Sequence, residues 1–170
     1  LPLFVQELEG ATEGVASAAG LVAGAAAAAG AVGAVLWGRV GDRWGHQRVL
    51  VGCIFLSACL YLPQFFVRGL GPLLALQVGT GLANGGLLTA ISALLARLSP
   101  EGREGLIYGL DSTAISVANF VGPMLGAGVA VRWGVRYVFL ATAGAMGLSG
   151  VLVVWLLERH VRAGGEPGPG

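Results

Sequence analysis

The chain has 170 residues, of which 55% are hydrophobic and 11% are charged, and its formal net charge is +1. Soluble domains carry about 25% charged residues, so this composition excludes an ordinary water-exposed surface. A charge so close to zero gives no indication of a nucleic-acid partner. We therefore expect an all-α membrane protein whose helices cross the lipid bilayer several times.

Five stretches are long and apolar enough to cross a membrane. A hydrocarbon core of about 30 Å requires about 20 mostly apolar residues in a helix. Four stretches of this length carry no charge, and a fifth is interrupted only by Asp111. The predicted spans are residues 14–38, 49–67, 70–96, 105–131 and 137–157.

The two ends of the chain differ from these spans. Residues 1–8 have the pattern of the last two turns of a helix, so we expect part of a sixth span there. Residues 163–170 are rich in glycine and proline, which predicts a disordered tail. Residues 1–162 are then expected to form one transmembrane bundle.

The ten arginines are unequally distributed over the two sides of this predicted bundle. Seven fall on the side that holds residues 38–50 and the C-terminus, and three fall on the other side. Positive residues concentrate in cytoplasmic loops. We therefore expect residues 38–50 and the C-terminus to face the cytoplasm, in a protein of the cell's inner (plasma) membrane.

The segment GRVGDRWGHQRVL, residues 38–50, concentrates charge between the first two complete spans. Its glycines permit a tight turn, and its aspartate can approach the N-terminus of a helix. Its arginines can pair with carboxylates or contact anionic lipid. An alternative is that the segment only fixes topology. The candidate residues of this segment are Gly38, Asp42, Arg43, Gly45 and Arg48.

The same segment resembles the signature loop of the major facilitator superfamily, G-x-L-x-D-R-x-G-R-K-x-x-L. Five positions match, and His46 and Gln47 stand where the family usually has two cations. A second stretch, residues 107–144, resembles the penultimate and last helices of bacterial drug/proton antiporters of that superfamily. The matches there are the Gly122-Pro123 pair and the join around Gly134 and Arg136.

This resemblance implies the C-terminal six-helix half of a twelve-helix transporter, with the N-terminal half of the same transporter as its missing partner. Small molecules would cross by alternating access, and the implied activity is proton-coupled export of drugs or other amphipathic compounds. Two alternatives remain open, namely a major facilitator carrier of sugars or other metabolites and a five-span scaffold without transport.

The triplet Arg-Trp-Gly occurs at residues 43–45 and again at residues 132–134. Each copy follows a span rich in glycine and alanine, and the predicted topology places the two copies on opposite sides of the membrane. Inverted repeats of three helices are the expected internal symmetry of such a half-transporter.

Polar residues within the spans are candidates for a transport path. In the third complete span, Gln77, Thr80 and Asn84 recur at helical spacing together with Leu88. Lipid disfavours such a stripe, so we expect it to face protein or water. Contact with substrate and hydrogen bonding between helices are both open interpretations, and Asn119 belongs to the same class.

Asp111 lies about two turns into its span. An ionisable group at membrane depth is costly and usually faces a cavity or a partner. It is therefore a candidate for binding a proton or attracting a cationic substrate. The alternative is a residue at the headgroup level, or one paired with Arg97 or Arg103.

Glycine, alanine and proline in the spans predict close packing and bending. Pro123 frees a carbonyl and bends its helix, so Gly122, Pro123 and Gly126 are candidates for a moving or a static kink. The glycine- and alanine-rich runs at 78–86 and 23–31 are expected to let helices pack closely rather than to bind a nucleotide.

Other chemistry is not expected from this sequence. Cys53 and Cys59 lie in one apolar run without the spacing of a redox pair, so both are predicted to be buried packing thiols. His46 and His160 have no partner ligands nearby in sequence, so no metal site is predicted. No nucleophile elbow, phosphate-binding loop or pair of catalytic carboxylates is present, so we expect neither an enzyme nor a cofactor.

Overall fold

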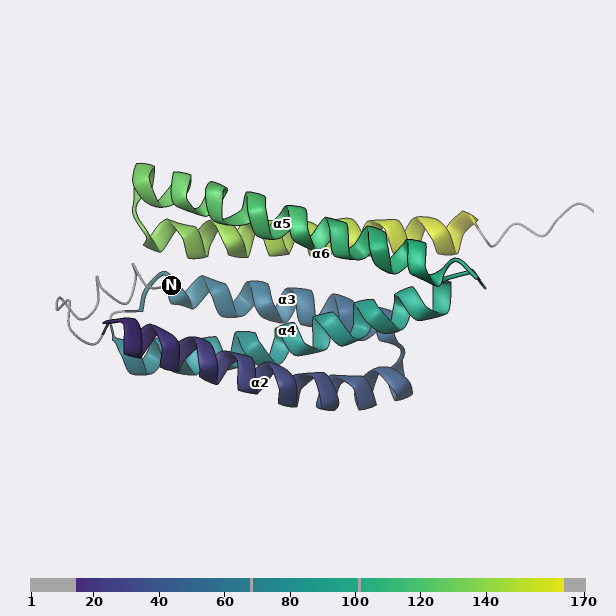
Figure 1. Ribbon diagram of the computed structural model, residues 1–170, viewed down its shortest axis with the longest axis horizontal. Helices are drawn as coiled ribbons and strands as arrows, with labels where there is room; N and C mark the ends of the chain where they lie inside the picture. The colour runs from purple at the N-terminus through teal and green to yellow at the C-terminus, as the bar shows by residue number, and fades with distance from the viewer. Residues whose placement is uncertain (1–14, 68, 101, 164–170) are drawn as a thin grey trace, which may run out of the picture.

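The computed structural model describes residues 15–67, 69–100 and 102–163, and this part of the chain consists of helices with short connections. The helices run back and forth along one long axis (Figure 1). In chain order they are α2 (Val15–Trp44), α3 (His46–Gln64), α4 (Leu70–Leu98), α5 (Glu104–Trp133) and α6 (Arg136–Ala163). All five are long and apolar enough to cross a membrane, which confirms the five predicted spans.

The prediction of a turn over residues 38–50 is wrong in its extent. α2 continues to Trp44 and α3 begins at His46, so Gly45 alone separates the two helices. α2 has 30 residues, and a helix of that length measures about 45 Å. That is the thickness of a bilayer including its headgroup regions, so the charged residues at the end of α2 can remain helical beyond the hydrocarbon.

Both Arg-Trp-Gly triplets end a helix in the same way. Gly45 and Gly134 have φ angles of 93° and 102°, a region that strains residues with a Cβ. Their backbone N–H groups donate to the carbonyls of Gly41 and Ala130, each at 2.9 Å. α2 and α5 end at opposite ends of the bundle (Figure 1), in agreement with an inverted placement of the two triplets.

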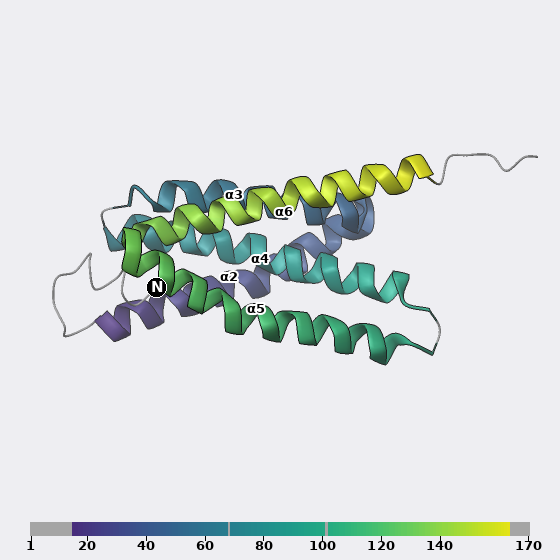
Figure 2. The same cartoon turned by 90° about the horizontal axis from the view of Figure 1, so that it is seen from above.

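α2 and α4 cross near their middles with their backbones in contact (Figure 2). A Cβ added to Gly81 would overlap the backbone of Ala26, and one added to Gly85 would overlap the backbone of Gly30. The expectation that the small residues of both runs permit close packing is therefore confirmed at these positions.

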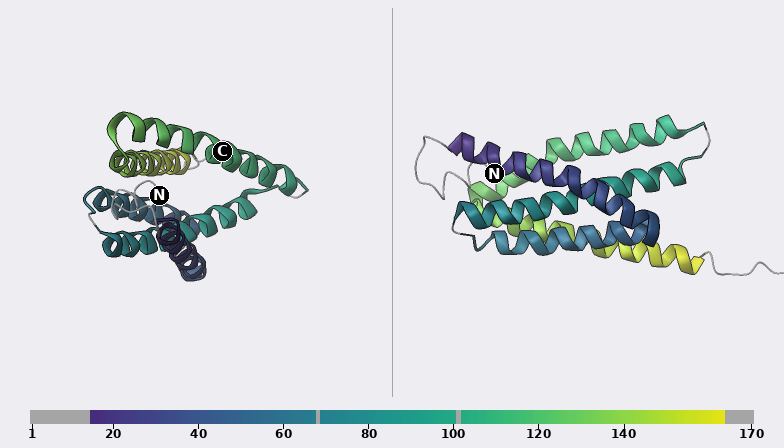
Figure 3. Two further views of the ribbon diagram at one scale, coloured as in Figure 1. Left: turned by 60° about the vertical axis from the view of Figure 1, so that its left-hand side comes forward. Right: turned by 90° about the horizontal axis from the view of Figure 1, so that it is seen from below.

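The helices form two layers, with α5 and α6 in one and α2, α3 and α4 in the other (Figure 3). α6 joins the layers by packing against α3. α5 contacts chiefly α6 and has no buried residue. Large apolar side chains of α5, such as Phe120 and Leu125, are 71% and 67% exposed.

The two cysteines do not share one environment. Cys53 is buried, as predicted, whereas Cys59 is exposed, so the prediction for Cys59 is wrong. Six residues at about 100° each place the two side chains about 120° apart around α3, one toward the bundle and one away from it.

The predicted partial helix at residues 1–8 lies outside the described residues. The predicted tail also lies outside them from residue 164 onward, and residue 163, which was predicted as part of the tail, is the last residue of α6.

We expect Gly85→Ala to destabilise the protein by about 1–3 kcal/mol, because the added methyl group forces α2 and α4 apart. Gly71→Ala is the matched control, since Gly71 lies on the same helix and has open space where a Cβ would be. Thermal unfolding of the purified protein in detergent measures both variants. Equal unfolding midpoints for the two variants would contradict the importance of the contact.

Candidate functional site

A groove of about 470 Å³ opens between α2 and α4. Four residues of α4 that the sequence placed on one stripe all line it, namely Gln77, Thr80, Asn84 and Leu88. The opposite wall is built from small residues of α2, which are Ala26, Ala27, Gly30, Ala31 and Ala34. We call this space the α2–α4 groove. Its polar side chains all come from α4, because the alanines and the glycine of the α2 wall have none.

Two of the polar groups in the α2–α4 groove bond to the bundle itself. Nε2 of Gln77 donates to Oε1 of Gln64 on α3 at 3.3 Å. Nε2 of Gln64 in turn donates to the carbonyl of Leu60 at 3.1 Å, and Gln64 is fully buried. The hydroxyl of Thr80 donates to the carbonyl of Gln77 at 2.9 Å. For Gln77 the structure therefore shows hydrogen bonding between helices.

Gln64 is not among the candidate residues predicted from the sequence. The signal was present, because Gln64 is an uncharged amide within the predicted span 49–67. A polar residue within a span is expected to face protein.

Asn84 has a different environment. It is half-buried, and its amide has no hydrogen-bond partner among the described residues. It is also the midpoint of α4, with fourteen residues of the helix on either side. An amide at that depth requires a partner, because lipid offers none. Water, a ligand or another part of the protein must supply it.

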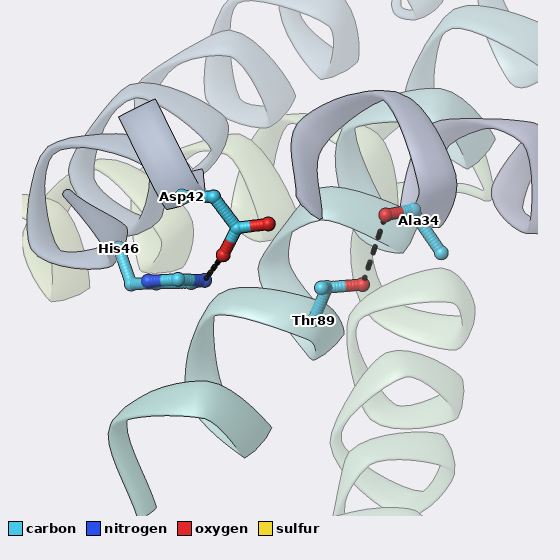
Figure 4. A network of polar contacts seen from close by, with 4 residues as sticks. All are labelled: Ala34, Asp42, His46 and Thr89. Carbon is cyan, nitrogen blue, oxygen red and sulfur yellow. Dashed lines mark hydrogen bonds and ion pairs between the residues drawn. The ribbon is translucent and has the colours of Figure 1, made fainter. Parts of the chain in front are cut away.

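One end of the α2–α4 contact is fixed by Thr89. Its hydroxyl donates to the carbonyl of Gly85 at 2.9 Å and lies 3.4 Å from the carbonyl of Ala34 on α2 (Figure 4). The second contact crosses between the helices. It holds α2 and α4 together about one turn beyond Gly85, where the glycine contact ends.

Among the described residues of the signature segment, Asp42 and His46 form an ion-pair contact. Nε2 of His46 lies 3.7 Å from Oδ1 of Asp42 (Figure 4). The imidazole is 6% exposed and packs on Gly41, where an added Cβ would lie 2.8 Å from the ring. This contact of Asp42 with His46 is not among the interactions predicted from the sequence, and the approach of the Asp42 carboxylate to a helix N-terminus stays a prediction.

The other candidates of the signature segment have different surroundings. Arg43 and Arg48 are exposed and have no hydrogen-bond or ion-pair partner within the described part of the chain. Gly38 faces Thr89, whose methyl carbon would lie 3.4 Å from an added Cβ. Gly45 is the single residue between α2 and α3.

The polar candidates of α5 do not join the α2–α4 groove. Asp111 is half-buried and Asn119 is exposed, and neither lines that groove. Within the described residues, Asp111 pairs with neither Arg97 nor Arg103. The roles of Asp111 and Asn119 remain predictions.

The proline of α5 does not end the helix. α5 is continuous from Glu104 to Trp133, with Pro123 in its interior. Gly126 faces Val138 of α6, whose Cγ1 would lie 3.8 Å from an added Cβ, whereas Gly122 faces open space. A role for these residues in bending remains a prediction.

Comparison with known proteins extends over the whole chain. The model of the family described as Major Facilitator Superfamily matches residues 1–170. Multidrug resistance protein MdtG of Dickeya zeae (strain Ech586) is 36% identical over 160 residues, which cover 94% of this chain and 39% of that protein. Multidrug resistance protein MdtG of Klebsiella pneumoniae (strain 342) is 31% identical over 167 residues, covering 98% and 40%. No solved structure matches.

These comparisons also relate the length of the chain to the length of its relatives. The chain spans about two fifths of the length of the curated relatives it matches.

We expect Gln77→Ala to lower the free energy of unfolding by about 1–3 kcal/mol, because it leaves the buried amide of Gln64 without its partner. The double variant Gln64→Leu/Gln77→Leu is expected to lose less stability than Gln64→Leu and Gln77→Leu lose in sum, as contacting residues do in a double-mutant cycle. Asn84→Ala is the control and should leave stability unchanged. Additive losses would contradict the hydrogen bond.

Proposed function

This chain belongs to the Major Facilitator Superfamily, and we propose that it is the C-terminal half of a twelve-helix transporter that moves small molecules by alternating access. Relatives named Multidrug resistance protein MdtG support export of drugs or other amphipathic compounds as the activity. The five apolar helices make it a multi-pass membrane protein. The arginine distribution supports an inner-membrane protein with a cytoplasmic C-terminus.

The observation that carries this proposal is the amide of Asn84 in the α2–α4 groove, which has no hydrogen-bond partner among the residues that the structure describes. Ligand pockets have volumes of about 300–1,000 Å³ and combine apolar walls with a few polar groups. The α2–α4 groove falls in this range, with methyl groups on one wall and a free amide on the other. In this proposal the groove is one side of the substrate site, and the other half of the transporter closes it.

The exposed faces of the bundle support the presence of that other half. α5 has no buried residue, yet it carries Ser112, Ser116 and Asn119 at helical spacing. The hydroxyl of Ser116 donates to the carbonyl of Ser112, but Asn119 has no such partner among the described residues. Because lipid does not satisfy an amide, this face of α5 requires protein or water. The relatives are long enough to supply it.

We expect Asn84→Ala to raise the half-saturation concentration for transport of a drug substrate by about 2- to 12-fold. This factor corresponds to the free energy of one hydrogen bond. Ser92→Ala, a substitution at an exposed position of the same helix, is the control. The measurement is efflux of a fluorescent substrate from cells with matched surface expression. Unchanged efflux in Asn84→Ala would remove the α2–α4 groove from the substrate path.

The proposal includes coupling to protons through Asp111. A carboxylate that binds either a proton or a cationic substrate makes the two compete, which is a minimal mechanism of antiport. Asp111→Asn keeps the size of the side chain but removes its titration. We expect it to weaken export of a cationic dye more than that of a neutral dye, and to flatten the pH dependence of export.

Glu104→Gln is the matched control for Asp111→Asn, because Glu104 is a carboxylate in the first turn of the same helix. It is expected to leave the pH profile of export unchanged. If Asp111→Asn lowers export of both dyes equally and its pH profile equals that of the unaltered protein, Asp111 is not the coupling residue.

A further inference from the structure

A second groove, of about 460 Å³, lies where α3 begins and α4 ends. Residues 44–48, at the junction of α2 and α3, line one side of it, and Leu94, Arg97 and Leu98 of α4 line the other. We call it the basic groove. It is separate from the α2–α4 groove, with which it shares no lining residue.

The described charged residues of the basic groove are both cationic. Arg48 comes from the first turn of α3 and Arg97 from the last turn of α4, and none of the described Asp or Glu residues lines the space. Neither guanidinium group has a hydrogen-bond or ion-pair partner among the residues that the structure describes. The nearby carboxylate of Asp42 contacts His46 and does not line the groove. Two unpaired cations at one groove favour an anionic ligand.

The backbone adds to this preference. α3 begins in the basic groove, and its N-terminus has neither a side-chain cap nor an acidic residue in its first turn. Unpaired N–H groups and the helix dipole make such an end favourable for an anion. His46 also lines the groove, and its buried Nδ1 has no hydrogen-bond partner among the described residues. At the start of α3 the N–H of Arg48 donates to the carbonyl of Gly45 at 3.2 Å, whereas the N–H groups of His46 and Gln47 have no backbone acceptor among the described residues.

The rim of the basic groove is apolar. Trp44 is 71% exposed and Leu98 is 74% exposed. Tryptophan is enriched at the level of lipid headgroups, where an indole contacts both the polar and the apolar regions. A ligand that carries a phosphate beside hydrocarbon matches both the two arginines and this rim, whereas a free phosphate uses the arginines alone.

We propose that the basic groove binds an anionic phospholipid, with its phosphate between Arg48 and Arg97 and its acyl region along Trp44 and Leu98. This proposal rests on the proposed function in one respect, namely that this end of the bundle lies at the cytoplasmic leaflet. Binding itself requires no transport, so a lipid site and a transport activity can fail independently.

The test measures binding of phosphatidylglycerol to the protein at its natural length, purified in detergent, by native mass spectrometry. An arginine near an anionic lipid surface contributes about 1 kcal/mol, so Arg48→Gln/Arg97→Gln should weaken binding about 30-fold and each single variant about fivefold. Arg39→Gln is the matched control, because Arg39 lies on α2 near the junction with α3 but does not line the basic groove. It should bind the lipid as the unaltered protein does.

Three further measurements distinguish the source of the anion and the integrity of the fold. Phosphatidylcholine should not replace phosphatidylglycerol, and millimolar inorganic phosphate should not displace it. Arg48→Lys/Arg97→Lys should retain most of the affinity, because the charges remain. Displacement by inorganic phosphate would assign the groove to a soluble anion and overturn the proposal. Equal lipid binding by the double glutamine variant, or no specific binding by the unaltered protein, would also overturn it.

Discussion

The backbone contact between α2 and α4 is the constraint on which the rest of the structure depends. Apolar helices gain little from association in lipid, because the hydrocarbon around them is as apolar as their own side chains. Close van der Waals contact must supply the attraction, and at Gly81 and Gly85 the helices approach until no side chain fits between them. The same shortage of side-chain volume on α2 leaves the α2–α4 groove unfilled. Tight packing and an open site thus have one origin.

Polar groups on α4 divide according to what surrounds them. Gln77 lies beside α3, where Gln64 satisfies it, and contributes to the stability of the bundle. Asn84 lies two turns further along, where α2 presents only small residues, and nothing described in the chain satisfies it. The same stripe of α4 therefore contains the amide of Gln77, which stabilises the bundle, and the amide of Asn84 at the middle of the helix, which is available to a ligand. Helical spacing alone makes these two amides equivalent, and only the neighbouring helix distinguishes them.

The sequence predicts the spanning helices, because the bilayer requires them, but it predicts less well the contacts that depend on which side chain lies opposite. The five spans follow from hydropathy because every crossing segment must satisfy its own backbone. Helix ends do not follow, because hydropathy marks the hydrocarbon boundary and α2 continues six residues past it. The bond between Gln64 and Gln77 requires the register of α3 against α4, and the contact of Asp42 with His46 requires the position of the helix break. The first is not encoded in spacing along one helix, whereas Asp42 and His46 have the i,i+4 spacing of a helical pair and keep their contact across the break at Gly45.

Among the described helices, α5 is the least covered, and its relation to α2 gives this bare face a meaning. Gly45 and Gly134 end α2 and α5 with the same geometry at opposite ends of the bundle, so these two helices are counterparts. α2 is covered by α4, the first helix of the second repeat. α5 has no such cover within the described part of the chain. We infer that the face of α5 that carries Ser112, Ser116 and Asn119 occupies the place that the α2–α4 groove occupies in the other repeat, and that it requires protein or water for the same reason.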